Sequence, residues 1–310
     1  MRRISGLLSV LLCVFLSIFC SSSVNAEDQA VTKAPDYATF KFVDTMSAKT
    51  SSVTEPKGGY YRPGDIWIGA FIDKHESGNK PRGLWGVGTF YPLNYKDGDK
   101  THSFGVALEG NYWNGVVEDG YYYYGNRYAI DLAYRLLRPL TNFEVRVGYG
   151  RVGDWGHIDT QPVGKYVSDQ TSDIITGYVG YEVRREETRL FSRARFYASA
   201  DYDIDQDKTD EWVAPDGVEW PLNGDSSNKT MYSLGIDGSI YDLTKTVSLA
   251  GGLSLTHYNE GSSTGLRASA GLDFDNAKDI LIGGIRVNYT DWSHGDNSVG
   301  LSAYYNLAKF

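Results

Sequence analysis

The sequence predicts an all-β fold, an up-and-down antiparallel transmembrane β-barrel of about 12 strands, with 14 strands as the alternative. Three observations favour this fold. Short segments of alternating apolar and polar residues recur down the chain, as expected of strands with two different faces. After the N-terminal apolar run, no segment approaches the ~18 consecutive apolar residues of a membrane-spanning helix. The 310 residues include 35 Gly and 24 Tyr but only 9 Pro, which is a folded, aromatic-rich composition.

The N-terminus has the pattern of a secretory signal peptide. Arg2 and Arg3 precede an apolar stretch from Leu7 to Phe19, and Ala26 ends a small-residue site suited to cleavage. The apolar stretch is shorter than the ~20 residues of a membrane anchor. Residues 1–26 are therefore predicted to be removed. The only cysteines, Cys13 and Cys20, lie in this segment, so a disulfide scaffold or a zinc–thiolate site is not expected.

The charge balance excludes one class of partner. The chain has 30 Lys and Arg against 39 Asp and Glu, a net charge of −9. Removal of Arg2 and Arg3 leaves 28 − 39 = −11. Nucleic-acid binding requires a basic face, so no nucleic-acid partner is expected.

Twelve segments are predicted to be strands. Two of them, 65–72 and 84–91, are apolar on both faces. The other ten alternate cleanly: 104–113, 128–136, 143–150, 175–184, 193–202, 232–240, 247–256, 266–274, 281–289 and 299–307. The apolar face of these ten carries charge only at strand ends, whereas the opposite face is rich in charge. A soluble β-sandwich has the same alternation with the apolar face inward, so the pattern alone leaves that alternative open.

The connections between these segments alternate between short and long, as in an up-and-down membrane barrel. Leu140 to Asn142 forms a tight turn, whereas 153–171 and 203–229 are predicted to be long extracellular loops. The predicted organisation is thus a signal peptide (1–26), a polar N-terminal periplasmic extension or plug (27–64), and the barrel (65–310). Residues 27–64 are alternatively an extra strand of a 14-stranded barrel.

The signal sequence, the alternating strands and a terminal aromatic, Phe310, after Tyr304-Tyr305-Asn306-Leu307 resemble Gram-negative outer-membrane β-barrel proteins. The resemblance covers about 245 residues at the level of the class. It implies a location in the outer membrane of a Gram-negative bacterium, with both chain ends periplasmic and with membrane lipid and lipopolysaccharide as partners.

The charges on the polar face are the candidate functional residues, because in a barrel they point into the interior. We predict that the pore is lined by Glu109, Asp131, Arg135, Glu144, Arg146, Glu182, Arg184, Arg193, Arg195, Asp237, Arg267, Asp273 and Arg286. Across the short turns, Arg135 is expected to approach Glu144, and Glu182 to approach Arg193, within one register step. These charges either fill a narrow interior as ion pairs or form a charge-balanced passage that favours neutral or zwitterionic solutes. A 12-stranded barrel lies between filled 8-stranded barrels and open 16-stranded porins.

Other motifs give weaker signals. The acidic run from Asp201 to Asp225 lacks the glycine and glutamate of a calcium loop, so it is either a solvated loop or one that gathers divalent cations. The five histidines lack metal-ligand spacing, and no metal, cofactor or catalytic residue is assigned. A rim acid–base site would combine Asp154, His157 and His294.

The leading functional prediction is a channel or export pore that passes small polar solutes or a polysaccharide through a charge-balanced lumen, with a possible periplasmic partner. The alternatives are a surface hydrolase with a site at the extracellular rim and a structural or adhesive barrel.

Overall fold

The computed structural model describes residues 64–76, 78, 80–116, 121–159, 165–185, 188–214, 219–222, 230–259, 263–275, 281–293 and 297–307. The signal peptide, nearly all of the 27–64 segment and Phe310 lie outside these residues and stay predictions. The strands are β1 (Gly64–His75), β2 (Arg82–Asp97), β3 (Lys100–Val116), β4 (Tyr121–Arg138), β5 (Thr141–Asp159), β6 (Lys165–Arg184), β7 (Leu190–Val213), β8 (Glu219–Leu222), β9 (Met231–Asp242), β10 (Val247–Tyr258), β11 (Ser263–Asp275), β12 (Leu281–Trp292) and β13 (Ser298–Asn306).

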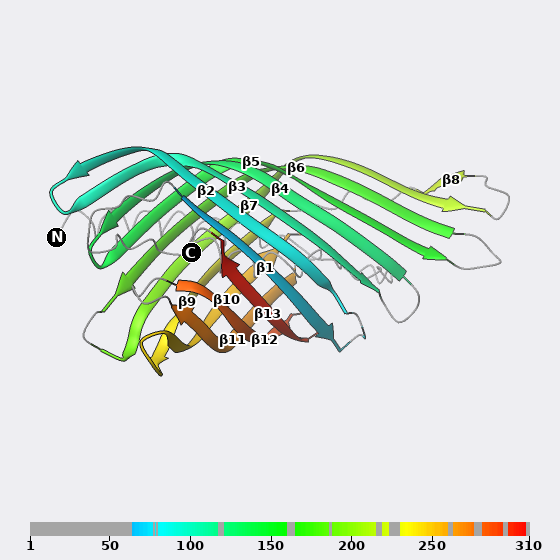
Figure 1. Ribbon diagram of the computed structural model, residues 1–310. Helices are drawn as coiled ribbons and strands as arrows, with labels where there is room; N and C mark the ends of the chain where they lie inside the picture. Colours follow the sequence, from blue (N-terminus) through cyan, green and yellow to red (C-terminus); the bar gives the residue numbers. More distant parts are fainter. Residues whose placement is uncertain are drawn as a thin grey trace. The chain divides into compact units, whose positions relative to one another are not determined.

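These strands form one closed antiparallel barrel (Figure 1). Each strand pairs with its neighbour along the chain except around β8, where β7 pairs with β9 and β8 adds to the far part of β7. The barrel closes where β1 pairs with β13, from Trp67 opposite Asn306 to His75 opposite Ser298. Twelve strands therefore make the wall, which confirms the predicted fold class, and β8 is one short strand outside it.

The strands differ greatly in length around the wall. β5, β6 and β7 have 19, 20 and 24 residues, whereas β9 and β10 have 12 each and β13 has 9. A membrane-spanning strand needs only about 9–11 residues. The long strands therefore extend past the bilayer at the end opposite the short turns, which is the extracellular end in this class (Figure 1).

This extension corrects the predicted long loops. β5 continues to Asp159 and β6 begins at Lys165, within the stretch predicted as a loop. β7 likewise continues into the acidic run as far as Val213. The ladder between β6 and β7 shifts register between Asp173 and Ile174, so that Asp201 and Asp203 are buried while Asp205 and Asp207 are exposed. Composition alone predicts a loop here. The chain forms a strand instead, because its backbone pairs with a long neighbouring strand.

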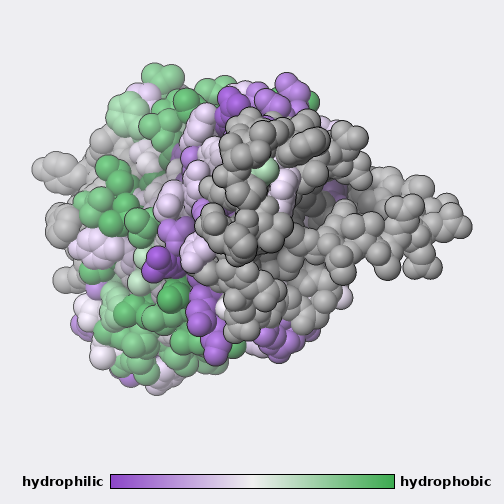
Figure 2. Space-filling model, turned by 90° about the vertical axis from the view of Figure 1, so that its right-hand side faces the viewer, coloured by the Kyte–Doolittle hydropathy of each residue, from purple (hydrophilic) through white to green (hydrophobic). Residues whose placement is uncertain are grey.

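Apolar side chains form a belt on the outward faces of the strands, and Figure 2 shows part of it as green patches on one side of the molecule. On β4, for example, Tyr128, Ile130 and Leu132 are exposed while Arg127, Ala129 and Asp131 are buried. The side chain of Leu132 is 74% exposed. Soluble proteins rarely expose contiguous apolar patches this extensive, whereas lipid-facing strands require them. The apolar face is thus outward, which excludes the β-sandwich alternative.

Within the described ranges, no helix is long and apolar enough to cross a membrane.

A β-bulge near the periplasmic end of β2 turns one aromatic side chain inward. Phe90 pairs with Val106 and Leu93 pairs with Phe104, so Tyr91 and Pro92 together oppose the single residue Gly105. Tyr91 is completely buried, although the predicted strand ends at that residue. A bulge of this kind re-aims a side chain, and its extra residue tolerates proline because it is not paired in the ladder.

Gly105 accommodates this bulge, because a Cβ there would meet the carbonyl oxygen of Phe90 and lie 2.8 Å from the Cα of Tyr91. We expect Gly105→Ala to lower the free energy of unfolding by about 1–3 kcal/mol, the usual cost of overpacking. Denaturant unfolding of the purified protein measures this. Gly110→Ala on the same strand is the control, since a Cβ there meets nothing within 4 Å. Equal effects of the two substitutions would refute the packing argument.

Candidate functional site

The predicted charged residues all lie on the inward face of the barrel wall, on β3–β7, β9, β11 and β12. Most are buried to nine-tenths or more, and only Arg184, Arg193 and Asp237 are partly exposed. The alternation of each strand positions them, because its outward residues face lipid and its inward residues must be polar or small. The structure gathers these charges into two networks of ion pairs.

The first network joins β3, β4, β5 and β7. Arg127 donates through Nε and Nη2 to the two carboxylate oxygens of Asp201, at 2.7 and 3.0 Å, and through Nη1 to Glu109 at 2.7 Å. Arg146 donates to Glu144 at 2.5 Å and lies 3.5 Å from the other oxygen of Glu109. All five side chains are at most 5% exposed. Bidentate, charge-assisted bonds of this type are the strong ones, and they hold the side chains in fixed positions.

Tyr91 extends the first network toward β2. Its hydroxyl donates to Glu144 at 2.9 Å, and the guanidinium carbon of Arg135 lies 4.1 Å from its ring centroid. A guanidinium over an aromatic face is attracted by the ring quadrupole, more strongly where water is excluded. The bulge in β2 therefore supplies a ring that holds one of the predicted arginines.

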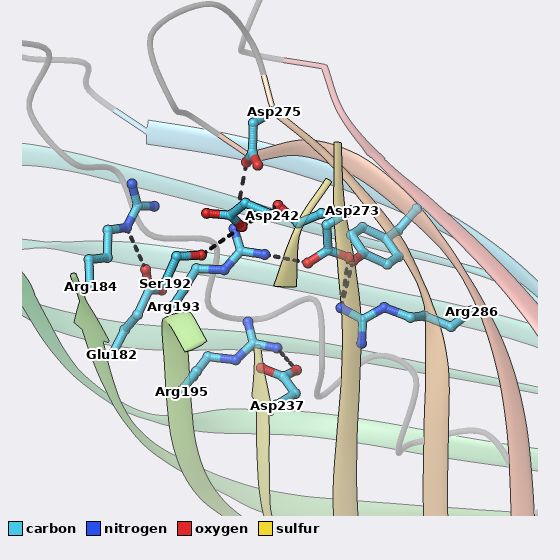
Figure 3. A network of polar contacts seen from close by, with 12 residues as sticks. Glu182, Arg184, Ser192, Arg193, Arg195, Asp237, Asp242, Asp273, Asp275 and Arg286 are labelled. Atoms are coloured by element: carbon cyan, nitrogen blue, oxygen red, sulfur yellow. Dashed lines mark hydrogen bonds and ion pairs between the residues drawn. The ribbon is translucent and has the colours of Figure 1, made fainter. Parts of the chain in front are cut away.

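The second network lies near the periplasmic ends of β6, β7, β9 and β11–β13 (Figure 3). Arg193 pairs with Asp273 and lies 3.7 Å from Asp275. Arg286 donates to Asp273 at 2.7 Å, and the Tyr304 hydroxyl donates to the same carboxylate at 2.5 Å. Figure 3 also shows two flanking pairs: Arg195 with Asp237, and Arg184 with Glu182 at 2.9 Å.

The expected contacts across the short turns form only in part. Arg135 lies opposite Glu144 in register, as expected, but Glu144 binds Arg146 and Tyr91. Glu182 lies opposite Arg195, and Arg184 lies opposite Arg193. Glu182 instead pairs with Arg184 on its own strand. Arg193 thus lies one register step from Glu182, as expected, but its ion pair extends across the interior to Asp273.

Several of these bonds join strands that are not neighbours in the wall. Arg127 on β4 bonds Asp201 on β7, and Arg193 on β7 bonds Asp273 on β11. Tyr91 on β2 likewise bonds Glu144 on β5. Such bonds span part of the barrel interior, so the side chains narrow it at the level of both networks.

Five inward aromatic side chains lie toward the extracellular ends of their strands. Trp85, Trp113, Tyr123, Tyr258 and Trp292 are each at most 6% exposed and belong to one apolar cluster. Tyr258 and Trp292 are in tilted contact, with ring centroids 5.7 Å apart. The interior thus has aromatic side chains at its extracellular end as well as beside the arginines of the two networks.

The predicted rim acid–base site does not assemble from Asp154 and His157. Asp154 pairs with Gly125 on the inward face of β5, whereas His157 stacks on the outward Tyr122 with ring centroids 5.3 Å apart. Residues three apart on a strand point to opposite faces. His294 lies outside the described residues. Among the residues that are described, no group of three or more His, Cys, Asp or Glu side chains could hold a metal ion.

Sequence reasoning did not select the tyrosines as site residues. Tyr91, Tyr178, Tyr197 and Tyr304 lie beside Arg135, Arg146, Arg195 and Arg286, with guanidinium carbons 4.1–5.9 Å from the ring centroids. Their positions on the polar face were a usable signal for Tyr178, Tyr197 and Tyr304. No alternation signal existed for Tyr91, because the bulge changes the phase of its strand.

Comparisons with solved structures agree with the barrel fold. The translocator domain of the autotransporter NalP from Neisseria meningitidis is 15% identical with a TM-score of 0.51, over 78% of this chain and 87% of that one. The transport unit of the autotransporter AIDA-I from Escherichia coli is 10% identical with a TM-score of 0.49, over 85% and 96%. KdgM porin in complex with oligogalacturonate is 9% identical with a TM-score of 0.38, over 77% and 98%. No family model and no curated protein matches the chain.

The closed wall of 12 strands and its apolar belt define the class of protein. The chain has the fold of Gram-negative outer-membrane β-barrels, and its place is the outer membrane. At this level the resemblance noted in the sequence is confirmed.

Proposed function

We propose that the protein is a narrow outer-membrane channel for small polar solutes. The observation that carries this proposal is the inward face of the wall, where arginines pair with carboxylates in two networks inside a closed barrel. Polar groups that face away from lipid in a barrel of this size are the usual lining of a passage.

The charge pattern supports neutral or zwitterionic solutes. In both networks arginines alternate with carboxylates, so an ion of either sign meets opposite and like charges along the same path. A sugar hydroxyl, by contrast, can donate to the carboxylates and accept from the guanidinium groups.

The bonds that cross the interior support a small solute in preference to a bulky polymer. A wide chain would have to break charge-assisted bonds such as Arg127–Asp201 on its way through, and such bonds are strong where water is excluded. If the transported solute is a polysaccharide, a short glycan in extended form is the one that fits this interior. A periplasmic partner would dock at the short-turn end, next to the second network.

Planar-bilayer recording of the full mature chain tests the proposal. We expect steady single-channel openings of low conductance with a reversal potential near zero under a salt gradient. A neutral monosaccharide should reduce the open-channel current. A correctly folded barrel that stays silent in the bilayer, or one with strong selectivity for one sign of ion, would refute the charge-balanced channel.

Substitution of Arg195 gives a signed prediction for the lining. Arg195→Ala removes a positive charge and leaves Asp237 without its ion pair, so selectivity should shift toward cations. Arg193→Ala should shift it in the same direction, since Arg193 pairs with Asp273. The double variant Arg195→Ala/Asp237→Asn should return the reversal potential toward the wild-type value. Arg138→Ala, at an exposed position by the periplasmic turn, is the control. Unchanged selectivity in both single variants would exclude these arginines from the pore lining.

A further inference from the structure

Arg135 differs from the other arginines of the first network in what its guanidinium contacts. Its side chain is 2% exposed, yet within the described part of the chain neither Nε nor Nη2 has a hydrogen-bond partner. Arg127 and Arg146 bind all three carboxylates of that network, namely Glu109, Glu144 and Asp201. Among the described residues, the side-chain contact of Arg135 is the one with the ring of Tyr91.

The two unpartnered atoms form one edge of the guanidinium. Nε and Nη2 present two parallel N–H groups, which match the two oxygens of a carboxylate. The corresponding edge of Arg127 binds a carboxylate in this way, since its Nε and Nη2 donate to both oxygens of Asp201. In Arg135 the same pair of donors has no carboxylate from the described chain. A buried cation with unmade hydrogen bonds is costly, so the position favours a ligand that supplies the missing acceptor.

A second unpartnered group lies on the neighbouring strand, β3. Ser103 on β3 is directly opposite Arg135 in the ladder, on the same inward face. Its side chain is fully buried, and its hydroxyl has no hydrogen-bond partner among the described residues. The hydroxyl can donate one further hydrogen bond to an oxygen. Two neighbouring strands thus offer three donors at one level of the interior.

We propose that Arg135 and Ser103 form a carboxylate-binding subsite in the channel interior, near its periplasmic end. The subsite rests on the proposed channel function and refines it: solutes that bear a single carboxylate, such as a sugar acid, are retained here, while neutral sugars pass. The ring of Tyr91 fixes the guanidinium plane, and the hydroxyl of Tyr91, bound to Glu144, fixes the ring. The subsite is therefore held in place before the ligand arrives.

Calorimetric titration of the full mature protein in detergent tests the subsite independently of conduction. D-glucuronate is the probe and D-glucose is its neutral control. We expect glucuronate to bind saturably and glucose to bind at least about tenfold more weakly, the effect of a charge-assisted bidentate contact. Arg135→Met should raise the dissociation constant for glucuronate by about tenfold or more, and Ser103→Ala by less. Arg138→Met removes an exposed arginine from the same strand and should leave binding unchanged.

The thermal unfolding midpoint separates binding from a structural role. Arg135→Met keeps the aliphatic stem and removes no ion pair, so its midpoint should stay at or above that of the wild type. Arg135→Lys keeps the charge but loses the two-pronged edge, and it should also bind glucuronate about tenfold more weakly. The subsite is refuted if the wild type does not bind glucuronate. It is also refuted if Arg135→Met and Arg135→Lys both bind glucuronate with wild-type affinity.

Bilayer recordings distinguish this failure from failure of the channel. If the protein conducts but does not bind glucuronate, the proposed function stands and the subsite is refuted. If the barrel is silent but binds glucuronate through Arg135, the subsite stands and the proposed function is refuted. In a conducting wild type, glucuronate should block the current at concentrations about tenfold below those needed in Arg135→Met.

Discussion

Replacement of Arg127 with methionine should lower the free energy of unfolding by about 3–5 kcal/mol, the cost of removing one partner from a buried ion pair. Methionine keeps much of the side-chain volume but none of the five donors. Glu109 loses its 2.7 Å bond and Asp201 loses both of its bonds to the guanidinium, and both carboxylates stay buried. Denaturant unfolding in lipid vesicles measures the difference.

Arg138→Met is the matched control, because Arg138 ends the same strand and is exposed; its effect should be within about 0.5 kcal/mol. The double variant Glu109→Gln/Asp201→Asn neutralises both carboxylates. Added to Arg127→Met, it should recover part of the loss, since no uncompensated charge then stays buried. A loss below 1 kcal/mol in Arg127→Met would mean that the first network contributes little to the barrel.

Substitution of Leu132 with arginine should destabilise the inserted barrel by about 2–4 kcal/mol, the cost of arginine on the lipid face near the bilayer midplane. Leu132 is 74% exposed on the outward face of β4, within its periplasmic half. The cost arises because a guanidinium replaces an apolar side chain in hydrocarbon. The measurement is reversible unfolding of the vesicle-inserted protein.

Leu140→Arg provides the comparison at the interface. Leu140 lies in the short turn between β4 and β5 and is 40% exposed, so arginine there should cost about 0–1 kcal/mol. A Leu132→Arg protein that unfolds and inserts like the wild type would contradict the placement of this surface against lipid.

The faces of the strands could be predicted from the sequence because alternation is a local property. Phe104, Val106 and Leu108 are exposed on β3, and Glu109 is buried, as the pattern requires. The pattern fails where the ladder is irregular. Leu281 alternates in phase with Ile285, yet it is buried, because the register shifts between Phe274 and Asp275.

Strand ends were less predictable than strand faces. The acidic residues from Asp201 to Asp210 have low β-propensity, and their composition suggests a loop. They are nevertheless strand, because β6 continues beside them and pairs with this part of β7 through all of its residues except Ile204. Whether a polar stretch is strand or loop therefore depends on the length of its neighbour, which no local pattern contains.

The sequence by itself determined the barrel class, the outward apolar belt and the identity of the inward charges, since each follows from residue type at a period of two. Only the tertiary structure decided which charges meet. Arg127 and Asp201 are 74 residues apart and Arg193 and Asp273 are 80 apart, and they meet because closure of the barrel brings non-neighbouring strands across one interior. Closure and the bulge at Tyr91 likewise leave the Nε–Nη2 edge of Arg135 without a carboxylate from the described residues. Hydrogen-bond partners inside a barrel are set by its curvature and register and not by order along the chain.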